Sequence, residues 1–69
     1  MRRKRIEISC RGIFLTYIEQ ESMMHGRCIA SIDTSVFTRD RKITLRDENH
    51  NDIAEVYVPI NAVLLVSYI

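Results

Sequence analysis

The hydrophobic residues near the C-terminus follow the two-residue period of a β-strand. From Glu55 to Ile60 the chain reads EVYVPI, with valine or isoleucine at every second position. This alternation is typical of a strand with one buried face. Because proline has no N–H to offer a sheet, we expect the strand to end at Pro59.

The next predicted strand is hydrophobic on both of its faces. Val63 to Val66 reads VLLV and is followed by Ser67, Tyr68 and Ile69. A strand of this kind must be covered on both faces, and the core of so small a protein can cover only one. We therefore predict a homo-oligomer with an interface at Val63, Leu65, Ser67 and Tyr68. The alternative is a central strand of a monomeric sandwich that lies under a helix.

Further strands are predicted in the first half of the chain. Residues 5–10 (RIEISC) alternate apolar and polar side chains, and Gly12 then indicates a bulge or a bend. Residues 13–24 fit both a helical spacing and a run of β-formers. We expect a strand as far as Ile18, followed by a loop or a single helical turn near residues 19–25.

The middle of the chain is predicted to continue as short strands and turns. In residues 27–32, Cys28, Ala30 and Ile32 share the face expected to be buried. The segments that follow are a turn at 33–35, a strand at 36–38, a polar hairpin tip at 39–42, a returning strand at 43–45 and a loop at 47–52. About six short strands predict a mainly β fold, a small barrel or sandwich.

Charge is distributed unevenly along the 69 residues. The net charge of +1 comes from ten Lys and Arg against nine Asp and Glu, and four of the positive charges are Arg2, Arg3, Lys4 and Arg5. Residues 6–69 then carry six positive and nine negative charges, a net −3. We expect residues 1–5 to form a flexible basic arm ahead of a single domain at 6–69.

Two basic segments are candidates for binding RNA phosphates. They are the arm residues Arg2, Arg3, Lys4 and Arg5, and the hairpin-tip residues Arg39, Arg41 and Lys42. Each phosphate contact would release counterions and make the affinity depend on salt. The alternative is a solvated terminus together with a charged turn that protects a sheet edge.

Residues that could support metal binding or catalysis are few. Cys10, His25, Cys28 and His50 could bind zinc, but only His25 and Cys28 have a ligand-like spacing. We expect two free, buried thiols, no metal, no cofactor and no enzymatic activity, and we expect the carboxylates of Asp47 and Glu48 to lie in a solvated loop with ordinary pKa values. No apolar run follows the arm, so we expect a cytoplasmic protein without a membrane partner.

The order of segments from Gly26 onward resembles the Sm-like family of RNA-binding proteins, which includes the Hfq-like RNA chaperones. The segments that carry the resemblance are Gly26, Ile32-Asp33, Val36-Phe37, the loop 47–52, Val56-Tyr57, the turn Pro59–Asn61 and the strand 62–68. The resemblance implies a small, five- to six-stranded, strongly bent antiparallel barrel of SH3-like shape. It also implies RNA contacts from the turn, where Asn61 lies, and a last strand that pairs with a neighbouring subunit. Ser35 and Val36 stand where the family has a base-contacting Asn.

Three functions are consistent with these features. The first is a self-associating barrel that binds RNA through its basic arm and turn residues. The second is a protein-interaction or inhibitor module, of the kind made by phages and mobile elements, which blocks a protein partner. The third is an oligomer that captures a nucleotide.

Overall fold

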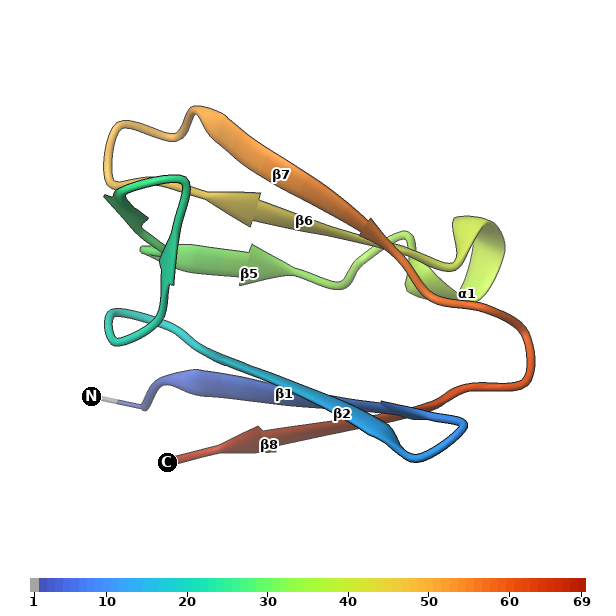
Figure 1. Cartoon of the computed structure of the whole chain (residues 1–69). Helices are drawn as coiled ribbons and strands as arrows, with labels where there is room; N and C mark the ends of the chain where they lie inside the picture. The colour runs from blue at the N-terminus through green and yellow to red at the C-terminus, as the bar shows by residue number, and fades with distance from the viewer. Residues whose placement is uncertain (1) are drawn as a thin grey trace.

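The strands lie in two facing layers in the computed structural model, which describes residues 2–69 (Figure 1). One layer is the sheet β2-β1-β8, built from β1 (Lys4–Cys10), β2 (Ile13–Ile18) and β8 (Val63–Tyr68). The other is the sheet β5-β6-β7, built from β5 (Ser31–Asp33), β6 (Lys42–Arg46) and β7 (Asp52–Tyr57). The hairpin of β3 (Met23–Met24) and β4 (Arg27–Cys28) lies at one end, and α1 (Phe37–Asp40) at the other. The mainly β prediction is confirmed, but the strands of residues 2–69 form three separate sheets and no closed barrel.

Two tight turns contain both glycines of the chain. Arg11 and Gly12 join β1 to β2 with φ angles of 51° and 80°, and His25 and Gly26 join β3 to β4 with 53° and 75°. Two consecutive positive φ angles define the two-residue hairpin turn whose twist matches that of the flanking strands. Gly12 therefore closes a hairpin, where we had expected a bulge or a bend.

The hydrophobic core lies between the two layers. Its buried members are Ile6 and Ile8 of β1, Ile29, Ile32 of β5, Ile43 and Leu45 of β6, and Val58. Each such side chain contributes about 1.5–3 kcal/mol when it is fully removed from water. Because β1 and β6 are the central strands of their sheets, their inner faces supply most of this core.

A hydrogen-bonded junction connects the two sheets where the chain leaves β2. The Glu19 carboxylate accepts hydrogen bonds from the backbone N–H of Lys4 at 2.8 Å and of Ile32 at 2.9 Å. The Lys4 ammonium in turn donates to the Ile32 carbonyl at 3.0 Å and to the Thr34 hydroxyl at 3.3 Å. Lys4 and Arg5 of the predicted arm thus lie in β1, and Met1 lies outside the described residues.

The segment around Phe37 is a helical turn, so the predicted strand at 36–38 is wrong. After α1, Arg41 takes a left-handed conformation (φ 53°) and donates hydrogen bonds to the carbonyls of Val58 at 3.3 Å and Pro59 at 2.6 Å. Its guanidinium also lies 4.7 Å from the centre of the Phe37 ring, an attractive cation–π distance. Over residues 19–25 the chain forms turns, which agrees with the expected loop, but it also contains the short strand β3, which was not predicted.

The buried face of residues 27–32 also differs from the prediction. Ile29 is fully buried, whereas Cys28 is exposed and Ala30 is half-buried. The segment is not one strand, because Ile29 donates to the carbonyl of Ser22 at 2.9 Å and Ala30 to that of Arg46 at 2.8 Å. This change of partner breaks the simple alternation, and the expectation that the Cys28 thiol is buried is wrong.

Candidate functional site

The outer face of sheet β2-β1-β8 combines three exposed hydrophobic side chains with few charges. Residues paired across an antiparallel ladder lie on the same face, so this face consists of the rows Phe14–Ser9–Val63, Thr16–Glu7–Leu65 and Ile18–Arg5–Ser67. Phe14, Val63 and Leu65 are exposed by 75%, 59% and 60%. In a monomer these side chains would remain in water.

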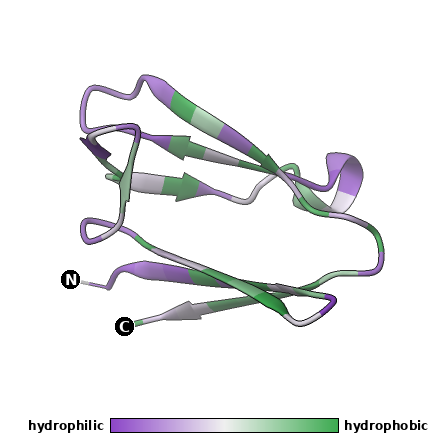
Figure 2. Ribbon diagram, in the orientation of Figure 1, coloured by the Kyte–Doolittle hydropathy of each residue, from purple (hydrophilic) through white to green (hydrophobic). Residues whose placement is uncertain are grey.

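The charges on this outer face belong to the central strand and compensate each other. The Arg5 guanidinium lies 3.6 Å from the Glu7 carboxylate and donates a hydrogen bond to the Ser67 hydroxyl at 3.1 Å. The edge strands β2 and β8 contain no charged residue, and Figure 2 shows hydrophobic segments along both. The face therefore offers a partner hydrophobic contacts and little net charge.

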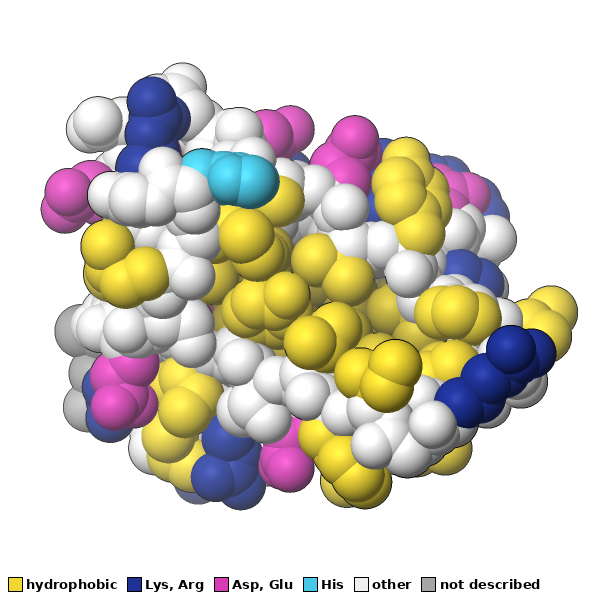
Figure 3. Space-filling view, in the orientation of Figure 1, with side chains coloured by type: hydrophobic (Ala, Val, Ile, Leu, Met, Phe, Trp, Pro, Cys, Tyr) yellow, Lys and Arg dark blue, Asp and Glu magenta, His cyan; other side chains and the backbone are white. Residues whose placement is uncertain are grey.

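The opposite side of the same edge strands is also incompletely covered. Ile13, Leu15, Val66 and Tyr68 pair with residues on the core-facing side of β1, and yet all four are exposed. Figure 3 shows hydrophobic side chains gathered in the hollow between the two sheets. Hydrophobic surface is thus exposed on both faces of the edge strands.

The predicted interface residues occupy two faces of β8. Val63, Leu65 and Ser67 share the outer face, as the period of the strand requires, whereas Tyr68 pairs with Lys4 on the opposite face. Phe14 was not predicted as a member of this surface. The signal was present, because residues 13–18 read IFLTYI and are apolar on both faces, as residues 63–66 are.

The outer face of sheet β5-β6-β7, by contrast, is covered with ion pairs. Lys42 contacts Glu55 at 2.8 Å, and Arg46 contacts Asp33 at 2.8 Å and Asp52 at 3.0 Å. The hydrogen bonds and charge of Glu55 raise the pKa of Lys42. Hydrogen bonds from the Ser35 hydroxyl and the Arg46 guanidinium hold the pKa of Asp33 well below its usual range.

The residues predicted to contact RNA lie at opposite ends of the molecule. Arg2, Arg3, Lys4 and Arg5 lie at the end that holds both termini, whereas Arg39, Arg41, Lys42 and Asn61 lie at the end that holds α1 (Figure 1). The principal extent of the protein is 32 Å. The structure therefore does not bring the two groups together on one surface of a monomer.

Most of these cations already have partners within the chain. Arg3 pairs with Glu21 at 3.2 Å and Arg39 with Asp40 at 3.1 Å, while Lys4 and Arg41 donate to the backbone. Among the predicted RNA contacts, the exposed Arg2 has no acidic partner within residues 2–69. The role of these residues in RNA binding stays a prediction.

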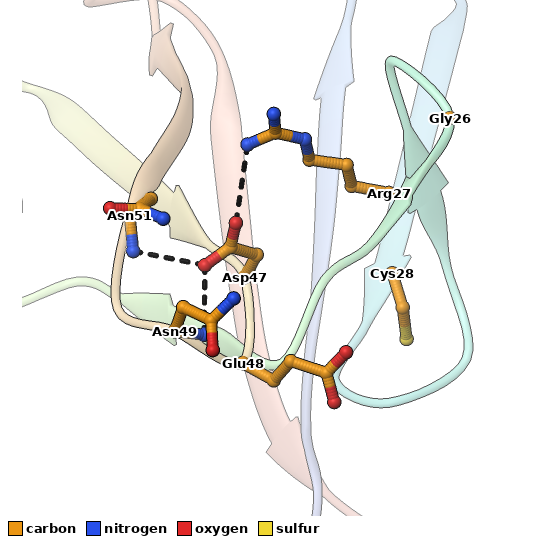
Figure 4. Close-up of a pocket in the computed structure, with 7 residues that line it drawn as sticks. All are labelled: Gly26, Arg27, Cys28, Asp47, Glu48, Asn49 and Asn51. Atoms are coloured by element: carbon orange, nitrogen blue, oxygen red, sulfur yellow. Dashed lines mark hydrogen bonds and ion pairs between the residues drawn. The ribbon is translucent and has the colours of Figure 1, made fainter.

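A polar pocket of about 440 Å³ lies between β4 and the turn 47–51 (Figure 4). It is lined by Gly26, Arg27, Cys28, Asp47, Glu48, Asn49 and Asn51. The Asp47 carboxylate accepts the backbone N–H groups of Asn51 at 3.0 Å and Asn49 at 2.9 Å, and it pairs with Arg27 at 3.2 Å. The hydrogen bond from Asn51 and then that from Asn49 lower the pKa of Asp47. Asp47 lies in the predicted loop but is buried, so the expectation that its carboxylate is solvated and has an ordinary pKa is wrong.

The contacts of Asp47 indicate that this residue has a structural role in the pocket. Both carboxylate oxygens are occupied, one by the turn 47–51 and one by Arg27, so the residue ties that turn to β4. In the described part of the chain, no group of three His, Cys, Asp or Glu side chains could hold a metal ion. Over the same residues, no helix has the length and hydrophobicity to cross a membrane.

Comparison of the chain with models of known protein families, with curated proteins and with solved structures gave no match. A function for this chain is therefore inferred from its own contacts, burial and charge. The surface that stands out by these measures is sheet β2-β1-β8 with its two uncharged edge strands.

Proposed function

We propose that this protein is a self-associating interaction module that assembles through sheet β2-β1-β8. The observation that carries the proposal is the exposure of Phe14, Val63 and Leu65 on the uncharged strands that flank β1. Contiguous exposed hydrophobic surface on a small protein marks a site of association. Unprotected edge strands are a second such signal, because they present unpaired backbone N–H and C=O groups to another strand.

A second copy of the chain is the partner that this surface fits. Because β2 and β8 carry no charge, two copies can meet through them without opposing like charges. The charges nearby, Arg5 and Glu7, are already compensated within each copy. Closed homo-oligomers are also the commonest assemblies of soluble proteins.

A specific interface would take a substantial share of the surface of so small a protein. A stable contact buries roughly 800 Å² on each partner, which is about one sixth of the 4773 Å² surface of this protein. Burying a leucine or phenylalanine side chain contributes about 1.5–3 kcal/mol. Exposed side chains of this size on each side of the contact can offset part of the entropy lost on association.

The test is the solution mass by light scattering over a range of protein concentrations. We expect an oligomer for the unchanged protein and a shift to monomer for Leu65→Asp, which puts a carboxylate into the contact. Tyr57→Asp is the matched control, because Tyr57 is equally exposed but lies on sheet β5-β6-β7, and it should keep the oligomeric mass. A folded protein that is monomeric at every concentration would contradict the proposal.

The same experiment reports on RNA if absorbance at 260 and 280 nm is recorded across the peak. Excess absorbance at 260 nm that is lost in Arg2→Ala would favour the RNA-binding alternative, because this arm residue has no acidic partner within residues 2–69. An oligomer without bound nucleic acid would favour the interaction module. An oligomer that carries nucleotide would indicate the third alternative.

A further inference from the structure

The backbone of β8 alternates between groups that face β1 and groups that face outward. Arg3 and Ile69 exchange two hydrogen bonds of 2.9 Å, one in each direction. In an antiparallel ladder such pairs recur at every second residue. Residues 63, 65, 67 and 69 therefore direct their N–H and C=O groups toward β1, and Leu64, Val66 and Tyr68 direct theirs to the free edge.

The other edge of the sheet is partly closed by its own chain. By the same alternation Phe14, Thr16 and Ile18 of β2 direct their backbone groups outward. The Ile18 N–H donates to the Ser22 hydroxyl at 2.9 Å, and the Ile18 carbonyl accepts from the N–H groups of Glu21 and Ser22. This turn blocks one end of the β2 edge, whereas no turn among residues 2–69 covers β8 in this way.

The edge of β7 is protected in a different way. It carries the charged residues Asp52 and Glu55, and its ladder with β6 has an irregular register between Leu45 and Arg46. Charged side chains and bulges are the usual means by which proteins keep an edge strand from pairing. The described edges therefore differ, and that of β8 is the one best prepared to accept a strand.

We infer that β8 pairs antiparallel with β8 of a second copy, with Val66 of both copies on the twofold axis. The inference rests on the proposed function and specifies how the copies meet. In this register Val66 is hydrogen-bonded to Val66 of the second copy, and Leu64 to Tyr68 of the second copy. Each pair exchanges two N–H···O bonds, so every outward-facing residue of β8 finds a partner.

The side chains of β8 suit this register. Val66 and Tyr68 are exposed by 41% and 54%, and both would be covered by the facing strand. The pairs between the hydrogen-bonded ones are Leu65 with Ser67 of the second copy, and Val63 with Ile69 of the second copy. No side chain in these pairs is charged, and the apolar cross-strand pairs among them stabilise a ladder.

The inferred pairing forms a closed dimer to which no further copy is added through β8. It joins two three-stranded sheets into one continuous sheet, in which β2 of each copy becomes an outer edge. A head-to-tail pairing of β2 with β8 could instead continue from copy to copy without closing. The turn at residues 18–22 opposes that open chain, because it occupies the outward groups of Ile18.

Cysteine cross-linking tests the register directly. In a background of Cys10→Ser and Cys28→Ser, Val66→Cys should form a disulfide-linked dimer under mild oxidation, because hydrogen-bonded partners lie about 5.5 Å apart at Cα. A mixture of Leu65→Cys with Ser67→Cys should give a cross-linked heterodimer. The controls are Phe14→Cys, an exposed position on β2, and Val63→Cys alone, because in this register Val63 faces Ile69 and not Val63 of the second copy. Both should stay uncross-linked on a non-reducing gel.

The outcomes separate this inference from the proposed function. The β8 pairing would be overturned if the protein has an oligomeric mass but neither Val66→Cys nor the mixture of Leu65→Cys with Ser67→Cys cross-links. That result would leave self-association standing. A monomeric mass would overturn both. If Val66→Cys disturbs the fold by circular dichroism, the mixed pair decides, because Leu65 lies on the exposed face.

Discussion

The two three-stranded sheets of this protein share one core and differ in what they present to the outside. On sheet β5-β6-β7 the outer residues form ion pairs, such as Lys42 with Glu55 and Arg46 with Asp33. On sheet β2-β1-β8 the corresponding positions of the edge strands include Phe14, Val63 and Leu65.

The edges of the two sheets differ in the same sense. In sheet β5-β6-β7 one edge strand, β5, has only three residues, and the other, β7, is charged and pairs irregularly. In sheet β2-β1-β8 both edge strands have six residues, no charge and an uninterrupted register. Proteins protect edges to prevent pairing with other chains, so the comparison teaches that sheet β5-β6-β7 has such protection on both edges and that the edge strands of sheet β2-β1-β8 lack these features.

The largest effect should follow from separating the two sheets at their junction. Glu19→Ala removes a carboxylate that accepts the N–H groups of Lys4 in one sheet and Ile32 in the other. Hydrogen bonds to charged groups contribute about 1.5–3 kcal/mol each. Glu19 accepts two, and both are only partly buried, so we expect a loss near the lower end of their sum, about 3 kcal/mol, in the free energy of unfolding by urea.

Glu21→Ala is the matched control for Glu19→Ala. Glu21 is close in sequence and pairs with Arg3, but its side chain is 51% exposed. Exposed ion pairs contribute at most about 1 kcal/mol, so this variant should unfold near the midpoint of the unchanged protein. Equal effects of the two substitutions would show that the Glu19 junction does not hold the sheets together.

A second prediction concerns the protection of β7. Glu55→Val should convert the segment from Ile53 to Val58 into an uncharged edge that resembles β8. We would combine it with Leu65→Asp, which we expect to be monomeric. The double variant should associate at protein concentrations about tenfold lower than Leu65→Asp alone, since burying a valine contributes at least about 1.5 kcal/mol. Light scattering measures the change, and Glu55→Gln, which stays polar, should remain monomeric. A monomeric Glu55→Val would mean that another feature protects β7.

The smallest effect is expected from acid acting on sheet β5-β6-β7. The pKa of Asp33 is held low by hydrogen bonds from Ser35 and Arg46. Its carboxylate therefore stabilises the fold above the pKa of the unfolded chain, about 3.9, and that contribution is lost as the pH falls from there toward the lower folded pKa. In urea titrations, the difference between the unchanged protein and Asp33→Asn should shrink from pH 6 to pH 2.5. A constant difference would exclude this role for Asp33.

The strands that have a clear pattern in the local sequence could be predicted. The alternation in residues 5–10, the β-formers of 13–18 and the apolar run at 63–66 correspond to β1, β2 and β8. The same run indicated which residues of β8 would be left exposed, including Val63 and Leu65. These predictions succeeded because the period of a strand alone determines which face each residue occupies.

The remaining features depend on contacts between distant parts of the chain. The turn of α1 is stabilised by Arg41, whose guanidinium reaches the carbonyls of Val58 and Pro59. The burial of Ile29 depends on a change of backbone partner from Ser22 at Ile29 to Arg46 at the next residue. No local spacing reports such contacts, so neither the helical turn nor this buried side chain could be read from the sequence.

The position of β1 between β2 and β8 has a consequence for the order of folding. β2 follows β1 after the two-residue turn at Arg11 and Gly12, so the β1–β2 hairpin can form as soon as its own residues are available. The strands β5, β6 and β7 are also consecutive along the chain. The ladder between β1 and β8, however, joins residues 4–9 to residues 63–68, and closing so long a loop carries a large entropic cost. During synthesis the β1 edge therefore stays unpaired until the last strand is made, and a nascent chain stalled before residue 63 would display this edge to any strand nearby.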